Sequence, residues 1–181
     1  NYINNSSKEN FMVNILENIK IKKDSSLNNI LINNSKCNGY FYKYIKSDLE
    51  KNSNFKNYLL SSGLRFNKLD IEINLNGENS NSSIFSALNC TNNEHQEIKT
   101  RINHNTPHCH SYQKIKNVLN HESKGVYQGK IFVKSTAQKT DAYQLSKALI
   151  LNDTAEFDAK PELEIYADDV KCSHGSTSGS I

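Results

Sequence analysis

Residues 110–166 decide the fold, and they read HSYQKIKNVLNHESKGVYQGKIFVKSTAQKTDAYQLSKALILNDTAEFDAKPELEIY. The strand-like segments in this stretch centre on Ile115, Ile131, Leu149 and Ile165, which gives spacings of 16, 18 and 16 residues. Antiparallel sandwiches usually show turn signals roughly every 8–12 residues and βαβ units insert a clear helix, and neither pattern is seen. A stride in the high teens is typical of a solenoid in which each turn of chain stacks a strand on the previous one. The sequence therefore predicts an all-β parallel β-helix, with an irregular β-sandwich as the alternative.

The chain before this stretch also carries strand signals. Apolar residues alternate between residues 11 and 32 around a polar turn at 24–26, and again at 71–75 before the turn dipeptide Asn76-Gly77. Residues 47–60 have a loosely helical spacing, which Asn and Ser side chains in the middle weaken because they compete for the backbone. Residues 1–181 are thus expected to form a single domain, and the absence of an initial Met suggests a piece of a longer protein.

Composition and charge exclude several classes of protein. The 181 residues carry 22 Lys and Arg against 19 Asp and Glu, scattered rather than in blocks, so we expect neither nucleic acid nor an acidic membrane as partner. No apolar run approaches the roughly 18 residues of a membrane span, and no signal segment opens the chain. Cysteines Cys37, Cys90, Cys109 and Cys172 form no CxxC pair, which predicts free thiols in a reducing compartment. A cytoplasmic location is expected, with a plastid stroma as the alternative.

Four sequence blocks in the last third occur in a specific order. They are the turn and strand Gly125 to Val133 (GVYQGKIFV), the segment Ala137 to Ala142 (AQKTDA), the segment Lys160 to Ile165 (KPELEI) and the segment Asp168 to Gly175 (DDVKCSHG). Together they resemble the SufD branch of the SufB/SufD family, which belongs to the SUF system of iron–sulfur cluster assembly. The resemblance extends upstream to His104, Pro107 and Ser111 and to Leu75-Asn76-Gly77-Glu78, and it covers about two-thirds of the chain.

This resemblance implies a right-handed parallel β-helix core without an enzymatic activity of its own. It implies a SufB-like paralogue as partner through the β-helix cores, and a SufC-like ATPase bound through a C-terminal helical domain that is absent from residues 1–181, as is the helical segment that precedes the core. A SufB-like scaffold is the alternative within the family, but its motif in place of Asp168–Gly175 differs. Ser176 and Ser178-Gly179-Ser180 depart from the family pattern and make the last strand more polar.

Cys172 and His174 are the candidate site residues. At positions i and i+2 of a strand they share one face, with Cβ atoms about 7 Å apart. Thiolate and imidazole are both ligands for iron, but two ligands cannot complete its coordination. The resemblance implies that His174 acts with a cysteine of the SufB-like partner. We therefore expect a transient cluster or iron that the partner completes, and no cofactor bound tightly to this chain alone.

The segment HNTPHCH (residues 104–110) is a weaker candidate for a zinc site. On a strand, His108 and His110 point to one side and Cys109 to the other, and Pro107 prevents a helix that would bring His104 and His108 together. We therefore expect no metal site there.

Other polar motifs have structural explanations. Lys139, Thr140 and Asp141 are expected to line a coil, with Gln138 and Thr140 bonded to neighbouring coils. Adjacent Asp168 and Asp169 point to opposite faces, which is poor geometry for sharing a cation. Glycines Gly125, Gly129 and Gly175 are expected at turns, bulges or close backbone approaches.

A β-helix enzyme that acts on polysaccharide is the alternative from another functional class. It requires a row of exposed acidic and aromatic side chains along one face of the solenoid. Tyr and Phe are spread along the chain, which counts against it.

Overall fold

Ten strands form the protein in the computed structural model, which describes residues 10–180 and, at residues 35–37, the backbone only. The ends of the predicted domain, residues 1–9 and 181, lie outside this described part. Within it there is no helix long and apolar enough to cross a membrane. The strands are β1 (Met12–Ile21), β2 (Ser26–Leu49), β3 (Asn54–Leu75), β4 (Asn81–Cys90), β5 (His95–His104), β6 (His110–Leu119), β7 (Lys124–Val133), β8 (Asp141–Ile150), β9 (Glu156–Ile165) and β10 (Lys171–Ser180).

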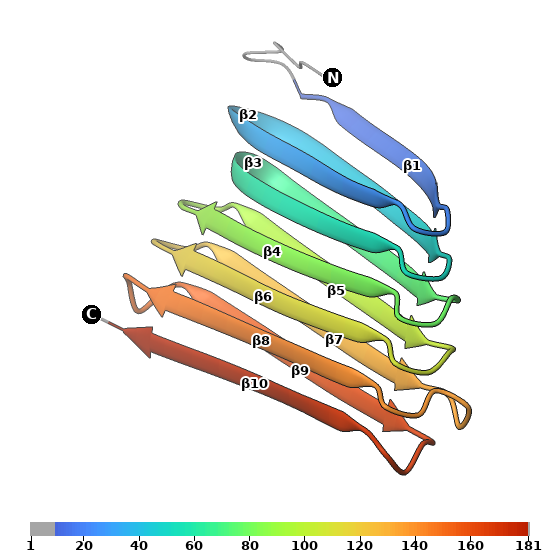
Figure 1. Ribbon diagram of the computed structural model, residues 1–181. Coiled ribbons are helices and arrows are strands. Elements are labelled where there is room, and N and C mark those ends of the chain that lie inside the picture. The colour runs from blue at the N-terminus through green and yellow to red at the C-terminus, as the bar shows by residue number, and fades with distance from the viewer. Residues whose placement is uncertain (1–9, 181) are drawn as a thin grey trace.

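The strands wind into a solenoid with two facing sheets (Figure 1). The front sheet contains the first halves of β2 and β3 and then β4, β6, β8 and β10, and the back sheet contains β1, the second halves of β2 and β3, and then β5, β7 and β9. Every pairing is parallel. In Figure 1 the front strands run from right to left and the back strands return while the chain descends, which is a right-handed winding. The predicted right-handed parallel β-helix is thus confirmed.

The stride seen in the sequence is half a coil rather than a whole one. Ile115 and Leu149 lie in β6 and β8 of the front sheet, whereas Ile131 and Ile165 lie in β7 and β9 of the back sheet. Consecutive strands therefore face each other across the interior, and each strand pairs with the next but one. The prediction that each segment stacks on the one before it was wrong, because each coil contains two strands, one in the front sheet and one in the back sheet.

Alternation of the side chains builds the core. In β7 the residues with odd numbers from Gly125 to Val133 are buried, and the residues between them face outward. The same alternation places Ile71, Ile73, Ile98 and Ile102 inside, each 2% exposed or less. Because the two sheets enclose one interior, each coil buries its apolar side chains against the coils above and below.

The turns repeat from coil to coil and use a left-handed backbone. Five of the six turns that lead from the back sheet to the front sheet contain one residue with positive φ, and the turn between β9 and β10 contains none. The five residues are Asp24, Asn52, Asn79, His108 and Lys139. Asn and Asp adopt this conformation more readily than most other residues. On the outside of the solenoid, asparagine side chains also form hydrogen bonds between neighbouring coils. For example, the side-chain nitrogen of Asn105 donates to the side-chain oxygen of Asn76 (2.8 Å).

The helical spacing of residues 47–60 does not produce a helix. β2 ends at Leu49, and β3 begins at Asn54. In between, Asn52 has φ 57°, and the Ser53 hydroxyl donates to the carbonyl oxygen of Glu50 (2.6 Å). The polar side chains that weakened the helical pattern thus form the turn.

The three glycines with predicted turn or bulge roles lie within strands instead. Gly125 and Gly129 face the interior of β7, and Gly175 lies in β10 beside Leu145. A Cβ at Gly129 would lie 2.3 Å from the hydroxyl oxygen of Tyr127, so a crowded side chain requires glycine there and no unusual φ does. Close approach of the backbone occurs at Gly77, where a Cβ would lie 1.9 Å from the backbone nitrogen of Lys51.

Candidate functional site: the inner face of the last strand

Cys172 and His174 lie on the inner face of β10, at the end of the front sheet. In the register of the parallel pair, Cys172 is opposite Ala142 and His174 is opposite Gln144. Ala142 and Gln144 are both buried in the interior, so the two candidate residues continue columns of inward-facing side chains. Within the described residues, β10 pairs with β8 only, so its other edge has no partner strand.

The two residues differ in exposure. Cys172 is half-buried and packs against an apolar cluster that includes Val133, Ala137 and Ala142, whereas His174 is exposed. Burial, and secondly the charge of Asp141, raise the pKa of the Cys172 thiol. The thiol is therefore mostly protonated at neutral pH, and a metal ion must displace its proton.

A set of hydrogen-bonded side chains lies in the interior next to the register position of His174. The Tyr127 hydroxyl lies 3.2 Å from the Gln144 side-chain oxygen and 3.3 Å from that of Gln113, and the Gln144 amide donates to the carbonyl oxygen of Gly129 (3.3 Å). Burial raises the pKa of Tyr127 to about 12, so it remains a neutral donor. A layer of hydrogen-bonded polar side chains thus lies next to the strand that carries the candidate site. Gln113 and Gln144 were not predicted from the sequence. They occupy the same inward register position as His174 in successive coils, and that position could have identified them.

The segment HNTPHCH is divided among separate environments. The His104 ring is fully buried, with Nε2 2.9 Å from the Ser111 hydroxyl and Nδ1 3.4 Å from that of Thr140. Burial, and secondly the proximity of His110, lower the pKa of His104 to about 3. His104 is therefore a neutral structural residue at physiological pH.

The other residues of that segment point elsewhere. Cys109 is buried beside the hydroxyls of Ser80 and Thr106, each 3.3 Å from its sulfur, while His108 and His110 are exposed. His108 does not share a strand face with His110 as expected, because it occupies the turn with φ 58° before β6 begins. Among the side chains that the structure describes, residues 10–34 and 38–180, no group of three His, Cys, Asp or Glu is arranged to hold a metal ion.

The AQKTDA segment joins neighbouring coils. The backbone nitrogen of His108 donates to the Gln138 carbonyl (3.0 Å), and the backbone nitrogen of Asp169 donates to the Gln138 side chain (2.9 Å). Thr140 contacts His104 in the coil above, and Lys139 forms an ion pair with Asp169 in the coil below. The structural roles predicted for Gln138 and Thr140 are confirmed.

Three of the cysteines are free. Cys90 and Cys109 are buried and Cys172 is half-buried, and none of the three forms a disulfide. The side chain of Cys37 lies outside the described part of the chain.

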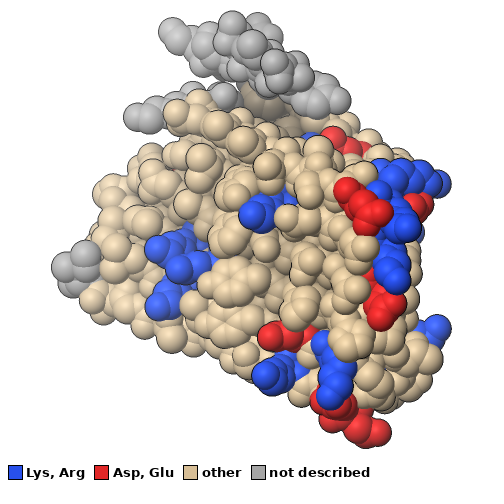
Figure 2. Space-filling model, viewed as in Figure 1, with Lys and Arg blue, Asp and Glu red and all other residues tan. Residues whose placement is uncertain are grey.

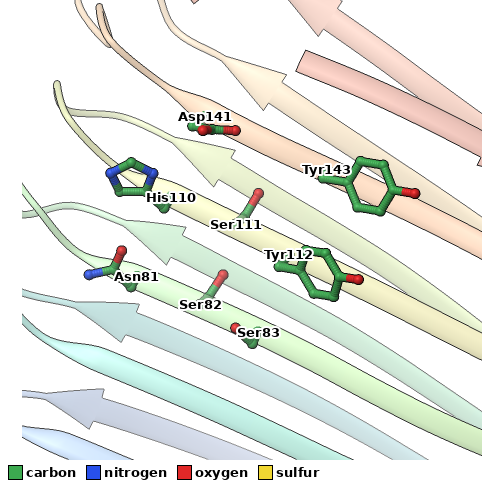
Figure 3. A pocket seen from close by; sticks show the side chains of 8 residues that line it. All are labelled: Asn81, Ser82, Ser83, His110, Ser111, Tyr112, Asp141 and Tyr143. Atoms are coloured by element: carbon green, nitrogen blue, oxygen red, sulfur yellow. The ribbon is translucent and has the colours of Figure 1, made fainter. Parts of the chain in front are cut away.

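A shallow depression crosses the outer side of the front sheet. Asn81, His110 and Asp141 lie in a row where β4, β6 and β8 begin, and Tyr112 stacks on Tyr143 beside them (Figure 3). Sequence analysis missed this surface, because its members are separated by 29 and 31 residues and meet only once the length of a coil is known.

The aromatic residues are aligned in space, contrary to the expectation from their spread in sequence. Ring contacts connect Tyr58, Phe85, Tyr112 and Tyr143, with centroids 5.5, 5.8 and 5.3 Å apart. The aromatic residues that the polysaccharide alternative requires along one face are thus present, but that alternative also requires a row of acids, and the described outward positions of the front sheet carry a single acid, Asp141.

Comparison with known proteins supports the resemblance. The family model described as "SUF system FeS cluster assembly, SufBD core domain" matches residues 1–181. The "Iron-sulfur cluster assembly protein SufD" of Escherichia coli (strain K12) is 44% identical over 107 residues, which are 59% of this chain and 25% of that protein. The "Iron-sulfur cluster assembly SufBD family protein slr0076" of Synechocystis is 44% identical over 73 residues, 40% of this chain and 16% of that protein. "Protein ABCI7, chloroplastic" of Arabidopsis thaliana is 26% identical over 159 residues, 87% of this chain and 34% of that protein.

The matched segments span about a third or less of these relatives, so the chain corresponds to one part of such proteins. The family model, by contrast, covers the chain from residue 1 to residue 181. This chain therefore belongs to the SufBD core domain family of the SUF iron–sulfur cluster assembly system.

Proposed function

We propose that this chain is the β-helix core of a SufD-like subunit that helps to assemble iron–sulfur clusters without catalysing a reaction of its own. The observation that carries the proposal is the placement of Cys172 and His174 together on the inner face of β10, with the imidazole exposed. The 44% identity to the protein named SufD favours this branch over a SufB-like scaffold.

The two residues supply an incomplete ligand set for the cargo. A thiolate and an imidazole can bind iron, and four-coordinate iron needs further ligands from elsewhere. A SufB-like paralogue that docks through its own β-helix core supplies the remaining ligands in this proposal. In this proposal the paralogue docks along β10, the strand that carries Cys172 and His174 and that pairs on one side with β8. A SufC-like ATPase binds to a helical domain outside residues 1–181.

Loading of iron is expected to depend on pH through Cys172. Its raised pKa keeps the thiol protonated near neutral pH, and iron binding releases that proton. The exposed imidazole of His174 is then the ligand that is available first, and the thiolate completes this half of the site.

The test uses the full-length protein in complex with its SufB-like and SufC-like partners, purified without oxygen. We expect His174→Ala to abolish accumulation of the cluster, measured by iron and sulfide content, while the complex still elutes as one assembly. His110→Ala is the matched control, because His110 is also an exposed histidine at a front strand but faces outward. An unchanged cluster content in His174→Ala would refute the role of His174, and an equal loss in both variants would show a general effect of losing a histidine.

A further inference from the structure

The outward-facing charges are distributed unequally between the two sheets. On the back sheet, lysines pair with acids, for example Lys68 with Glu97 (3.0 Å) and Lys124 with Asp158 (2.9 Å). The outward positions of the front sheet carry five lysines and a single acid, Asp141. These lysines are Lys56, Lys114, Lys116, Lys147 and Lys171. None of the five forms an ion pair with a described residue. The front face is therefore a basic surface whose charge the chain itself does not neutralise.

Three of these lysines are placed where they repel one another. Lys116 and Lys147 are directly opposite in the register of β6 and β8, and Lys114 lies two residues before Lys116 on the same face. Like charges at directly opposed positions destabilise a sheet. Asp141 is too far away to offset this repulsion, since it is opposite His110, four positions before Lys114 and about 13 Å from it. In Figure 2 a group of Lys and Arg atoms lies on the left of this face without an acid beside it, whereas acids and bases mix near the turns on the right.

The aromatic row adjoins this lysine triad (Lys114, Lys116 and Lys147). Lys114 is opposite Phe85 in the register of β4 and β6, and it lies two residues after Tyr112 on the same face. Tyr58 is 36% exposed, Tyr112 is 37% exposed, and Leu60 nearby is 47% exposed. An apolar, aromatic centre bordered by charge is the usual composition of a protein-binding surface.

We propose that the outer face of the front sheet binds an acidic segment of a partner protein, with carboxylates on the lysine triad and apolar side chains on the aromatic row. Nucleic acid fits this face less well. The described outward positions of the front sheet carry no arginine, the residue that is best suited to bidentate phosphate recognition. This surface lies on the opposite side of the front sheet from Cys172 and His174, and the inference does not depend on the proposed function.

The test measures fluorescence anisotropy of labelled probes with the full-length protein. The probes are the peptide EEFEEFEEFEE, its counterpart KKFKKFKKFKK and the oligonucleotide dT12. We expect the Glu/Phe peptide to bind, with an affinity that falls as salt rises, and the Lys/Phe peptide not to bind. The triple variant Lys114→Glu, Lys116→Glu, Lys147→Glu should weaken binding of the Glu/Phe peptide at least about tenfold.

A matched variant distinguishes an effect of this surface on binding from an effect of the net charge of the protein. Lys20→Glu, Lys99→Glu, Lys134→Glu changes three exposed lysines outside the front face and alters the charge equally. This variant should weaken binding of the Glu/Phe peptide less than about twofold. Equal weakening by both variants, or no binding of the Glu/Phe peptide, would overturn the proposal. Tighter binding of dT12 that the front-face variant abolishes would assign the surface to nucleic acid instead. Circular dichroism spectra of both variants check that the β-helix is retained.

Discussion

At the scale of single residues, the interior of this solenoid is specified by the side chains that crowd it. Gly129 leaves room for the hydrogen bond between Tyr127 and Gln144, and His104 fits among hydroxyl groups as a neutral ring. The glycine and histidine motifs mark these positions in the sequence, but they do not reveal why glycine and histidine are required there. Turn glycines and strand glycines look alike in one dimension, and the crowding at Gly129 comes from its own strand and from Gln144, fifteen residues away.

The crowding at Gly129 predicts a large effect of one methyl group. Gly129→Ala would place a Cβ 2.3 Å from the Tyr127 oxygen and 2.5 Å from Gln144 Oε1. We expect it to lower the free energy of unfolding by about 1–3 kcal/mol in urea denaturation, because an overfilled core must rearrange. Gly179→Ala is the control, since a Cβ at position 179 would meet no atom within 4 Å and the stability should be nearly unchanged. Equal effects would mean that crowding is not the reason for glycine at position 129.

Burial of His104 predicts a stability loss in acid. Its pKa is about 3 in the folded chain, below the value of about 6.5 in an unfolded chain. As the pH falls from about 6.5 toward 3, the unfolded chain binds the proton first, so the free energy of unfolding decreases, by an amount on the order of a few kcal/mol. His104→Gln keeps a hydrogen-bonding side chain without this titration. Its stability should therefore vary less with pH than that of the wild type over this range, and identical pH profiles would contradict the assignment.

At the scale of strands, the alternation of side chains was easier to predict than the pairing of strands. The strands around Ile71 and Ile131 were evident from their period of two, and β10 presents Cys172 and His174 on one face as their i, i+2 spacing requires. The pairing was not evident, because a strand spacing of 16–18 residues does not distinguish one coil from half a coil. Residues such as His110 and Asp141, which meet only across a full coil, were therefore missed.

The position of Cys172 on β10 predicts selective modification of cysteines. Iodoacetamide should label Cys172 in the folded protein, slowly at neutral pH and faster as the pH rises, because its thiol pKa is raised. Cys90 and Cys109 are fully buried and should be labelled only after denaturation. Mass spectrometry of peptides from native and denatured samples distinguishes the sites. Native labelling of Cys90 at the rate of Cys172 would show that the solenoid is more open than described.

At the scale of the whole molecule, the two sides of the front sheet have different roles in our proposals. In these proposals the inner face of β10 presents Cys172 and His174 as ligands for iron, and the outer face presents lysines and aromatic rings. A solenoid permits this division, because neighbouring strands repeat the same inner and outer columns from coil to coil. The fold class followed from the repeat of the sequence, whereas the two surfaces required the true length of the coil.

The central claim is that His174 becomes a ligand of iron only when a SufB-like partner completes the site. X-ray absorption at the iron edge, on the full-length complex loaded with iron in the absence of oxygen, tests this claim most directly. The account predicts a nitrogen ligand together with sulfur ligands in the wild-type complex, loss of the nitrogen in His174→Ala, and no bound iron when the SufD-like subunit is alone. A spectrum that is the same with and without the His174 imidazole would contradict it.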